Sequence, residues 1–228
     1  MKQILAAALI GAGIGLFARR EELVEVPSMQ PASAFIACAE NRDDLISRLK
    51  RLEVPSLPEY NRLLPVLYGA SKRHGLVLEH LAVICLAESQ GASSTRFEPA
   101  FLRRYIEPAF KDGQNKFTKV YSLVKKKDRS LTMQRFKKWL ASSAGPLQVM
   151  YSVAIEHGFR GSLAELAQPV NNAECAARYL KSKDMTEDSS LETVLRVYNT
   201  GSAKGIPKKG YLDRAREYCI YLGVPYEK

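Results

Sequence analysis

A single carboxylate closes an apolar run in the middle part of the chain. The run extends from Leu81 to Ala87, and Glu88, Ser89 and Gly91 follow it. Apolar residues at helical spacing predict a buried helix that holds Glu88 near its C-terminal end, with Gly91 as its stop. Apolar surroundings and the negative end of the helix dipole both favour the protonated acid, so the sequence predicts a raised pKa for Glu88. Such a carboxylic acid suits general acid catalysis on glycosides, although a surface glutamate where a core helix emerges is the alternative.

Three further motifs follow in chain order. They are Ser143 to Met150 (SAGPLQVM), Ala176 to Leu180 (AARYL) and Val197 to Gly201 (VYNTG). Together with Glu88-Ser89 they resemble the soluble lytic transglycosylase family, whose successive motifs are Glu-Ser, Gly-Leu-Met-Gln-Ile, Ala-x-x-Tyr-Leu and Ala-Tyr-Asn-Ala-Gly. The likeness spans Glu88 to Gly201, and Tyr211 adds a weaker fifth match.

The resemblance implies a fold and an activity. Members of this family have a mostly α, lysozyme-like fold in two lobes with a glycan cleft between them. They cleave the β-1,4 bond between N-acetylmuramic acid and N-acetylglucosamine in peptidoglycan, without a metal or organic cofactor. By resemblance, Glu88 is the catalytic residue: it first protonates the glycosidic oxygen and then, as a carboxylate, accepts a proton from the muramic C6 hydroxyl. The expected product is a 1,6-anhydro sugar.

The remaining motif positions are candidate substrate-binding residues, and each has a structural alternative. Ser89 matches a serine that hydrogen-bonds near the reacting sugar, or is an exposed helix-end serine. Tyr198 and Asn199 match residues beside the acid and in the cleft wall, but they also fit an ordinary helix-ending turn. Gln148 matches the glutamine of the second motif. Tyr179 is expected in a helix core close to the cleft.

The chain departs from the family in the spacing of its first two motifs. Glu88 and Gln148 are 60 residues apart, more than in compact members, and Pro146 and Leu147 replace the usual Leu-Met. The extra chain includes Arg96-Phe97-Glu98-Pro99, which resembles phage-associated and goose-type-lysozyme-like relatives. Hydrolytic glycosidases use two carboxylates about 5 to 10 Å apart, and Glu98 is the best second candidate, ahead of Glu107 and Asp112. A hydrolysing muramidase therefore stays open as an alternative.

Length and composition indicate three segments. With 228 residues and 46% apolar content, the chain has room for one domain of about 150 to 170 residues and a smaller appendage. Residues 1–20 form the predicted transmembrane anchor or signal-like segment, since residues 4–18 carry no charge and no cleavage site is evident. Gly11 and Gly15 offer a weak self-association motif. Residues 21–58 are expected to be a linker with a short helix, and residues 59–228 the lysozyme-like domain.

Apolar periodicity predicts an all-α or nearly all-α domain. The expected helices are Arg42–Leu52, Glu59–Arg73, Leu76–Ser89, Pro99–Tyr105, Phe117–Lys126, Thr132–Ser142, Pro146–Glu156, Ser162–Ala167, Val170–Ser182, Ser189–Asn199 and Lys209–Leu222. No segment shows a sustained strand pattern, and a small hairpin is expected within residues 90–97.

Charge is concentrated in residues 116–138, where nine lysines and arginines accompany Asp128 alone, giving +8 of the chain's net +10. This segment fits an anionic partner or a solvated helical face. Its aromatic residues fit core spacing as well as base stacking, and no nucleic-acid-reading motif accompanies them. The four cysteines, Cys38, Cys85, Cys175 and Cys219, are widely separated, which favours buried free thiols over a metal site.

The sequence therefore predicts an enzyme that is anchored in a membrane and acts on peptidoglycan glycan strands. Its catalytic domain would face the periplasm and cell wall, or belong to the membrane-associated part of a phage virion. The rival from another class is a non-catalytic membrane or virion structural protein that binds glycan or nucleic acid.

Overall fold

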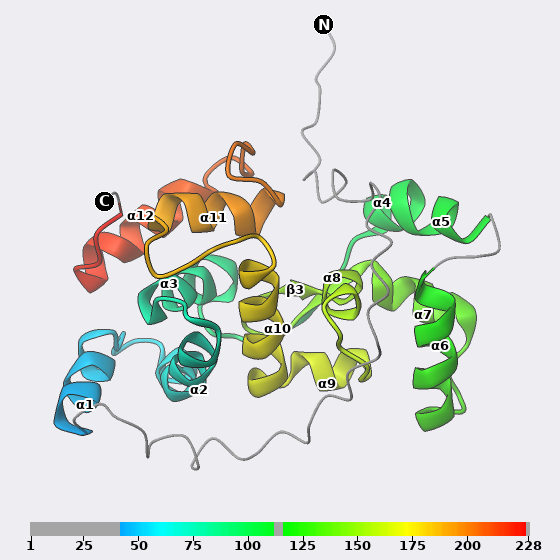
Figure 1. Cartoon of the computed structure of the whole chain (residues 1–228), viewed down its shortest axis with the longest axis horizontal. Coiled ribbons are helices and arrows are strands. Elements are labelled where there is room, and N and C mark those ends of the chain that lie inside the picture. The colour runs from blue at the N-terminus through cyan, green and yellow to red at the C-terminus, as the bar shows by residue number, and fades with distance from the viewer. Residues whose placement is uncertain (1–41, 112–115, 227–228) are drawn as a thin grey trace, which may run out of the picture.

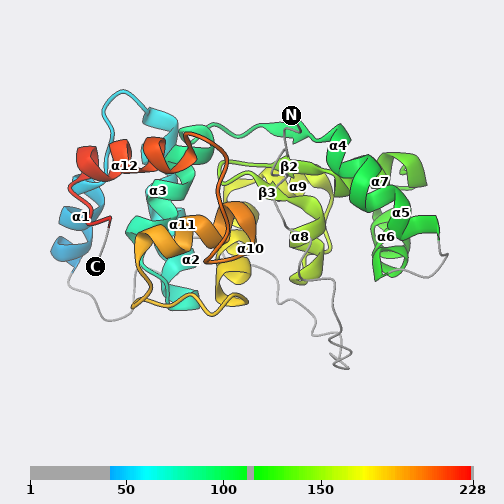
Figure 2. The same cartoon turned by 90° about the horizontal axis from the view of Figure 1, so that it is seen from above.

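The computed structural model describes residues 42–111 and 116–226, and it confirms a mostly helical fold. One end of the molecule holds α1 (Arg42–Arg51), α2 (Pro58–His74), α3 (Leu78–Ser89), α10 (Pro169–Lys181), α11 (Leu191–Thr200) and α12 (Tyr211–Leu222). The other end holds α4 (Pro99–Phe101), η2 (Leu102–Ile106), α5 (Glu107–Lys111), α6 (Lys116–Lys127) and α7 (Met133–Leu140). Three short strands, α8 (Tyr151–Glu156) and α9 (Leu163–Ala167) lie between these two groups (Figures 1 and 2).

Helix α3 is the centre of the first group. It packs against α2, α11 and α12, and nine of its twelve residues are buried. A helix that is apolar on all sides is stable only when protein surrounds it, and these neighbours supply that cover. The helix ends at Ser89, as predicted, but its left-handed C-cap residue is Gln90 and not the predicted Gly91. Gly91 also has a positive φ, and a Cβ there would lie 2.6 Å from the Tyr60 Cα, so only glycine fits.

The strands form an antiparallel sheet in the order β1-β2-β3, with β1 at Thr95–Phe97, β2 at Ser142–Ala144 and β3 at Val149–Met150. The expected hairpin within residues 90–97 is wrong, because β1 pairs with β2, so that Arg96 lies opposite Ser143. Strands this short have no periodicity of their own, and a distant partner is invisible to local patterns.

The predicted helix Pro146–Glu156 is wrong in its first half. Residues 145–148 form a turn that leads into β3, and α8 begins at Tyr151. Gly145 and Gln148 both have positive φ angles, which a right-handed helix does not accommodate. This turn lies beside Glu88, because the neighbouring Ser89 is hydrogen-bonded to it.

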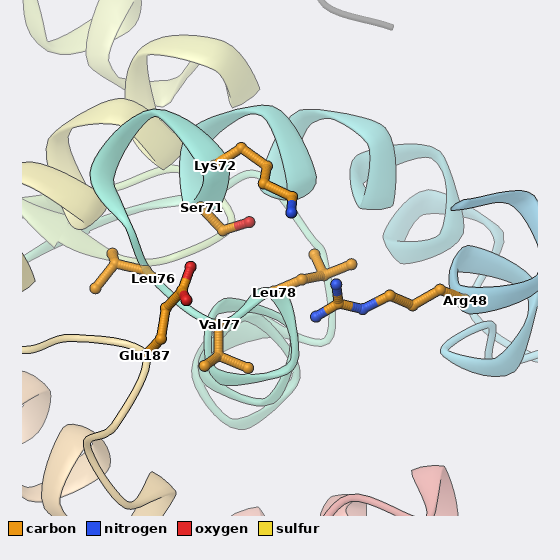
Figure 3. Close-up of a pocket in the computed structure, with 7 residues that line it drawn as sticks. All are labelled: Arg48, Ser71, Lys72, Leu76, Val77, Leu78 and Glu187. Atoms are coloured by element: carbon orange, nitrogen blue, oxygen red, sulfur yellow. The ribbon is translucent and has the colours of Figure 1, made fainter. Parts of the chain in front are cut away.

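A cavity of about 190 Å³ lies at the junction of α2 and α3 (Figure 3). It is lined by Arg48, Ser71, Lys72, Leu76, Val77, Leu78 and Glu187. Ser71 donates its hydroxyl proton to the Tyr68 carbonyl at 2.9 Å, so part of the polar lining serves the end of α2.

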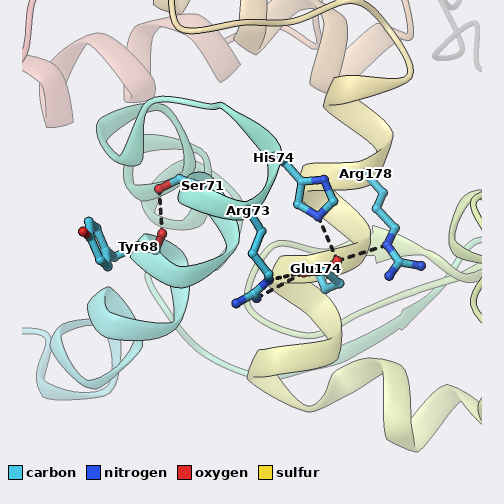
Figure 4. A network of polar contacts seen from close by, with 6 residues as sticks. All are labelled: Tyr68, Ser71, Arg73, His74, Glu174 and Arg178. Carbon is cyan, nitrogen blue, oxygen red and sulfur yellow. Dashed lines mark hydrogen bonds and ion pairs between the residues drawn. The ribbon is translucent and has the colours of Figure 1, made fainter. Parts of the chain in front are cut away.

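Helices α2 and α10 are joined by a cluster of charges around Glu174 (Figure 4). The Glu174 carboxylate accepts hydrogen bonds from Arg73 Nε and Arg178 Nε, each at 3.1 Å, and His74 Nε2 lies 2.8 Å away. Burial alone would raise the pKa of Glu174, but the hydrogen bond with His74 and the charges of His74, Arg73 and Arg178 outweigh it and lower the pKa to about 2. The ionised carboxylate therefore stabilises the packing of α2 on α10.

We expect Glu174→Gln to lower the free energy of unfolding at pH 7 by about 2–3 kcal/mol, because three basic side chains lose one charged acceptor. A carboxyl whose pKa is lowered by folding stabilises the protein above its unfolded value of 4.5, and this contribution is lost as the pH falls toward 2. The difference between variant and wild type in urea denaturation should therefore shrink over that range. Glu192→Gln, which removes an i,i+4 pair with Arg196, is the control and should cost about 0.5 kcal/mol or less. Equal losses for the two variants would contradict the assignment.

Several sequence predictions concern residues outside the described ranges. Among residues 42–111 and 116–226, no helix is long and apolar enough to cross a membrane. The predicted anchor at residues 1–20, with Gly11 and Gly15, lies outside these ranges, as does Cys38, and these stay predictions. Cys85, Cys175 and Cys219 are buried free thiols.

Candidate functional site

Glu88 is the penultimate residue of α3, and protein surrounds most of its side chain, which keeps some contact with solvent. Burial raises the pKa of this carboxyl from 4.5 to about 7. The nearby Tyr211 hydroxyl and the positive charges of Arg96, Lys208 and Arg214 oppose the rise. Near neutral pH the carboxyl is therefore divided between its protonated and ionised forms.

Tyr211 begins α12, and only 2% of its surface is exposed. No hydrogen bond of ordinary geometry joins its hydroxyl to another described residue, but the hydroxyl is a neighbour of the Glu88 carboxyl and lowers its pKa. Tyr211, the weakest of the sequence matches, therefore acts on Glu88.

The turn at residues 145–148 joins Glu88 to the other motifs. Ser89 donates its hydroxyl proton to the Pro146 carbonyl at 2.5 Å, which fixes the end of α3 to the turn. Tyr198 in α11 donates to the Leu147 carbonyl at 2.7 Å. The first, second and fourth motifs therefore meet at one place, although they lie far apart in the sequence.

Gln148 uses its side-chain amide inside the protein. Its Oε1 accepts a hydrogen bond from the Ser143 hydroxyl at 2.9 Å, and its Nε2 donates to the Gly145 carbonyl at 2.9 Å. The same Nε2 lies 3.1 Å from both the carbonyl and the hydroxyl oxygen of Ser94. Gln148 thus braces the turn against the segment that enters β1, and in this arrangement it shapes the site.

Asn172 is a site residue that the sequence reasoning missed. It is fully buried in α10, donates from Nδ2 to the Ala144 carbonyl at 2.7 Å, and accepts at Oδ1 from the Leu147 N–H at 2.8 Å. Because Asn172 precedes Ala176 and Tyr179 at i, i+4, i+7 spacing, it lies on the core face of its helix. A polar residue at such a position is the signal that could have revealed it.

The three other predicted residues lie around this centre. Tyr179 donates to the Val197 carbonyl at 3.1 Å, and its ring centroid is 6.0 Å from that of Tyr198, so it packs behind Tyr198. Asn199 accepts a hydrogen bond from the Lys208 N–H at 3.1 Å. Glu98 pairs with Arg96 at 2.7 Å. Glu98 therefore pairs with a cation whose charge also acts on Glu88, whereas Asn199 contacts only the backbone of Lys208.

No family model, curated protein or solved structure matches this chain. The likeness to lytic transglycosylases therefore depends on the four sequence motifs, and the structure contributes the contacts that bring three of them together.

The cavity of Figure 3 is not at this site. It opens beside the first residues of α3, whereas Glu88 lies ten residues further along the same helix, about 15 Å away at 1.5 Å per residue. The carboxyl with the raised pKa marks the candidate site, because groups with shifted pKa values cluster at functional sites. In the described part of the chain, His, Cys, Asp and Glu do not gather in threes as a metal site requires.

The contact with Tyr211 makes a prediction about titration. The Tyr211 hydroxyl favours the ionised carboxylate, so Tyr211→Phe should raise the pKa of Glu88 further, by about one unit. The measurement is an NMR titration of the Glu88 side-chain carboxyl carbon. Tyr218→Phe on the same helix removes a hydroxyl bonded to Gln90 Nε2 at 2.8 Å and serves as the control, with an unchanged titration. A lowered pKa in Tyr211→Phe would show that the hydroxyl stabilises the protonated acid instead.

Proposed function

We propose that this protein is a lysozyme-like lytic transglycosylase that cleaves the β-1,4 bond between N-acetylmuramic acid and N-acetylglucosamine in peptidoglycan. The observation that carries the proposal is the pKa of Glu88, raised to about 7 by burial at the place where three motifs meet. A carboxyl that titrates near neutral pH is able to donate a proton in one step and to accept one in the next.

In the proposed reaction the protonated Glu88 gives its proton to the glycosidic oxygen, and the bond from that oxygen to C1 of the muramic residue breaks. The neighbouring acetamido oxygen of the substrate supports the positive charge at C1. Glu88 is then a carboxylate, which Arg96, Lys208 and Arg214 stabilise. It accepts the C6 hydroxyl proton as the C6 oxygen bonds to C1. The acid is regenerated, and no water is consumed.

The hydrogen bonds of the turn suggest that the remaining candidate residues hold the site in shape. Ser89 and Tyr198 both donate to carbonyls of the turn, and Gln148 and Asn172 hold it from the other side. With these bonds in place the Leu147 and Pro146 backbone is fixed beside Glu88. We propose that this turn forms the part of the glycan site that lies against the reacting sugar.

A hydrolysing muramidase is the second candidate, and the position of Glu98 favours it. Glu98 pairs with Arg96, whose charge also acts on Glu88, so two carboxyl groups share one cation. In such an enzyme Glu98 would activate water or stabilise the charged sugar.

Mass spectrometry of muropeptides released from purified sacculi tests the proposal. A product lighter by one water than the reducing-end form supports the transglycosylase, and Glu98→Gln should then keep most of its activity. A reducing-end product together with inactive Glu98→Gln would support the muramidase. Sacculi that stay intact would overturn both activities and favour a non-catalytic structural protein. We further propose that residues 1–20 anchor the domain in a membrane and that it faces the wall, in a bacterial envelope or in a phage virion.

A further inference from the structure

Helices α6 and α7 lie at one end of the molecule (Figure 1), and residues 116–138 are strongly basic. Its described cations, all exposed except the half-buried Lys137, are Lys119, Lys125, Lys126, Lys127, Arg129, Arg135, Lys137 and Lys138. We call this set the basic face. Asp128 is the acid among them, and its carboxylate accepts hydrogen bonds from the Ser130 hydroxyl and N–H. No ion pair within the described ranges joins a cation of the basic face to a carboxylate.

The helices hold this charge away from the core. On α6 the buried residues Phe117, Val120 and Val124 face inward. Lys119 and Lys126 are exposed on the opposite side, and their separation of seven residues corresponds to about two turns, or about 10 Å. On α7, Phe136 and Trp139 are buried, whereas Arg135 and Lys138, three residues apart, are exposed. The positive charge is therefore fixed in place by helices whose apolar sides are already packed.

The basic face offers little besides charge. The Tyr121 ring packs against Phe136 with centroids 5.4 Å apart, and Phe136 and Trp139 both pack edge-on against Tyr151, so these rings do not form a platform for nucleic-acid bases. Leu123, 41% exposed, is the large apolar side chain on this face that solvent reaches. Six of the eight cations are lysines, which act as point charges and do not form the two-pronged contacts of arginine.

We propose that the basic face binds a flexible chain of phosphate groups through charge alone. A membrane surface fits less well, because interfacial helices insert an apolar side into the lipid, and here that side is buried in the core. Sequence-specific binding of nucleic acid fits less well because the aromatic rings already pack against one another and are not free to stack on bases. A flexible polyanion needs neither an exposed apolar helix side nor free aromatic rings. Lysines at helical spacing that form no ion pair with a carboxylate in the described ranges match its repeated charges.

The basic face lies close in sequence to the candidate site. Helix α7 leads directly into β2 and then into the turn beside Glu88, and the Ser142 hydroxyl donates to the Lys138 carbonyl at 2.8 Å. A polyanion on the basic face would therefore lie near the strand that borders the site. Binding does not require cleavage, so the two proposals fail separately: Glu88→Gln should bind the polyanion as well as wild type does.

Fluorescence anisotropy with labelled inorganic polyphosphate and the full chain tests the inference. Charge reversal at both Lys119→Glu and Lys126→Glu should weaken binding at least about tenfold, because two attractive charges become repulsive. The matched control reverses two exposed lysines on the other group of helices, Lys50→Glu and Lys181→Glu, and should change binding less than about threefold. Raising the salt from about 50 to about 200 mM should weaken wild-type binding by roughly 50-fold if four phosphates are engaged.

Parallel measurements separate the partners. Duplex DNA that binds more tightly than polyphosphate of equal charge would overturn the proposal in favour of nucleic acid. Vesicles of phosphatidylcholine and phosphatidylglycerol whose binding depends on Lys119 and Lys126, when polyphosphate binding does not, would overturn it in favour of a lipid surface. Equal effects of the two double variants would show that net charge alone is responsible and that the basic face is no site. Circular dichroism confirms that each double variant keeps its helices.

Discussion

Glu88→Gln is expected to abolish wall cleavage and, at alkaline pH, to make the protein more stable. Glutamine keeps the shape of the side chain but neither gives nor takes the proton, and general acid–base catalysis contributes about 10²- to 10⁴-fold for each such group. Because Glu88 serves both steps of the proposed reaction, we expect a loss of about 10³-fold or more in the rate of sacculus digestion.

The stability effect follows from the direction of the pKa shift. Folding raises the pKa of Glu88 from 4.5 to about 7, so the folded protein holds the proton more tightly than the unfolded chain does. Stability is therefore lost as the pH rises from 4.5 through 7, and glutamine, which stays neutral, avoids that loss. Allowing for the solvent that still reaches the side chain, we expect Glu88→Gln to gain about 1–3 kcal/mol at pH 8 and nothing near pH 4.

Thermal unfolding at pH 4 and at pH 8, beside a dye-release assay on sacculi, checks both parts. Glu217→Gln, an exposed carboxylate on α12, is the control and should leave both quantities unchanged. Full activity in Glu88→Gln would show that Glu88 is not the catalytic residue. A variant that is inactive and also destabilised at pH 8 would mean that the ionised Glu88 supports the fold, contrary to its raised pKa.

Gly145→Ala should be the most damaging small substitution in the turn. Gly145 has a φ of +77°, and a Cβ there would lie 2.4 Å from the Asn172 Cγ. The left-handed backbone costs a non-glycine residue about 1–2 kcal/mol, and the forced displacement of Asn172 adds about 1–3 kcal/mol of overpacking. Because Asn172 also holds the Leu147 N–H, the turn beside Glu88 should shift as well, and cleavage should fall at least tenfold.

Gly75→Ala is the matched control for this substitution. Gly75 has a φ of +58° at the end of α2, and a Cβ there meets no atom within 4 Å. This variant bears the backbone cost alone, so urea denaturation should show a loss of about 1–2 kcal/mol with normal cleavage. Equal losses at the two positions would mean that Asn172 moves aside freely and that the turn is not tightly held.

Local patterns in the sequence were enough for most helices. Amphipathic or apolar periodicity placed α1, α2, α3, α6, α10 and α12 within about two residues of their observed ends, because each buries a regular face. The same reasoning anticipated the raised pKa of Glu88 from its apolar helix. It failed at residues 145–150, where two left-handed residues make a turn and strand out of a segment with helical composition.

Local sequence patterns could not predict the contacts among the site residues. Ser89 and Gln148 were expected to face a sugar, but the structure gives their polar atoms partners in the turn. Asn172 lies in no motif, and its role depends on α10 packing against the turn. Likewise, the charge of Arg96 acts on Glu88 because β1 pairs with a strand 47 residues further along, a pairing that no local pattern encodes.

The burial of helix α3 also affects how this protein unfolds in heat or denaturant. Glu88 lies on a rod-like helix of which nine of the twelve residues are buried, against helices drawn from both halves of the polypeptide. Such a rod cannot loosen by itself, since its opening would expose the core as a whole. Any activity that depends on Glu88 should consequently be lost in the same cooperative step as the global structure.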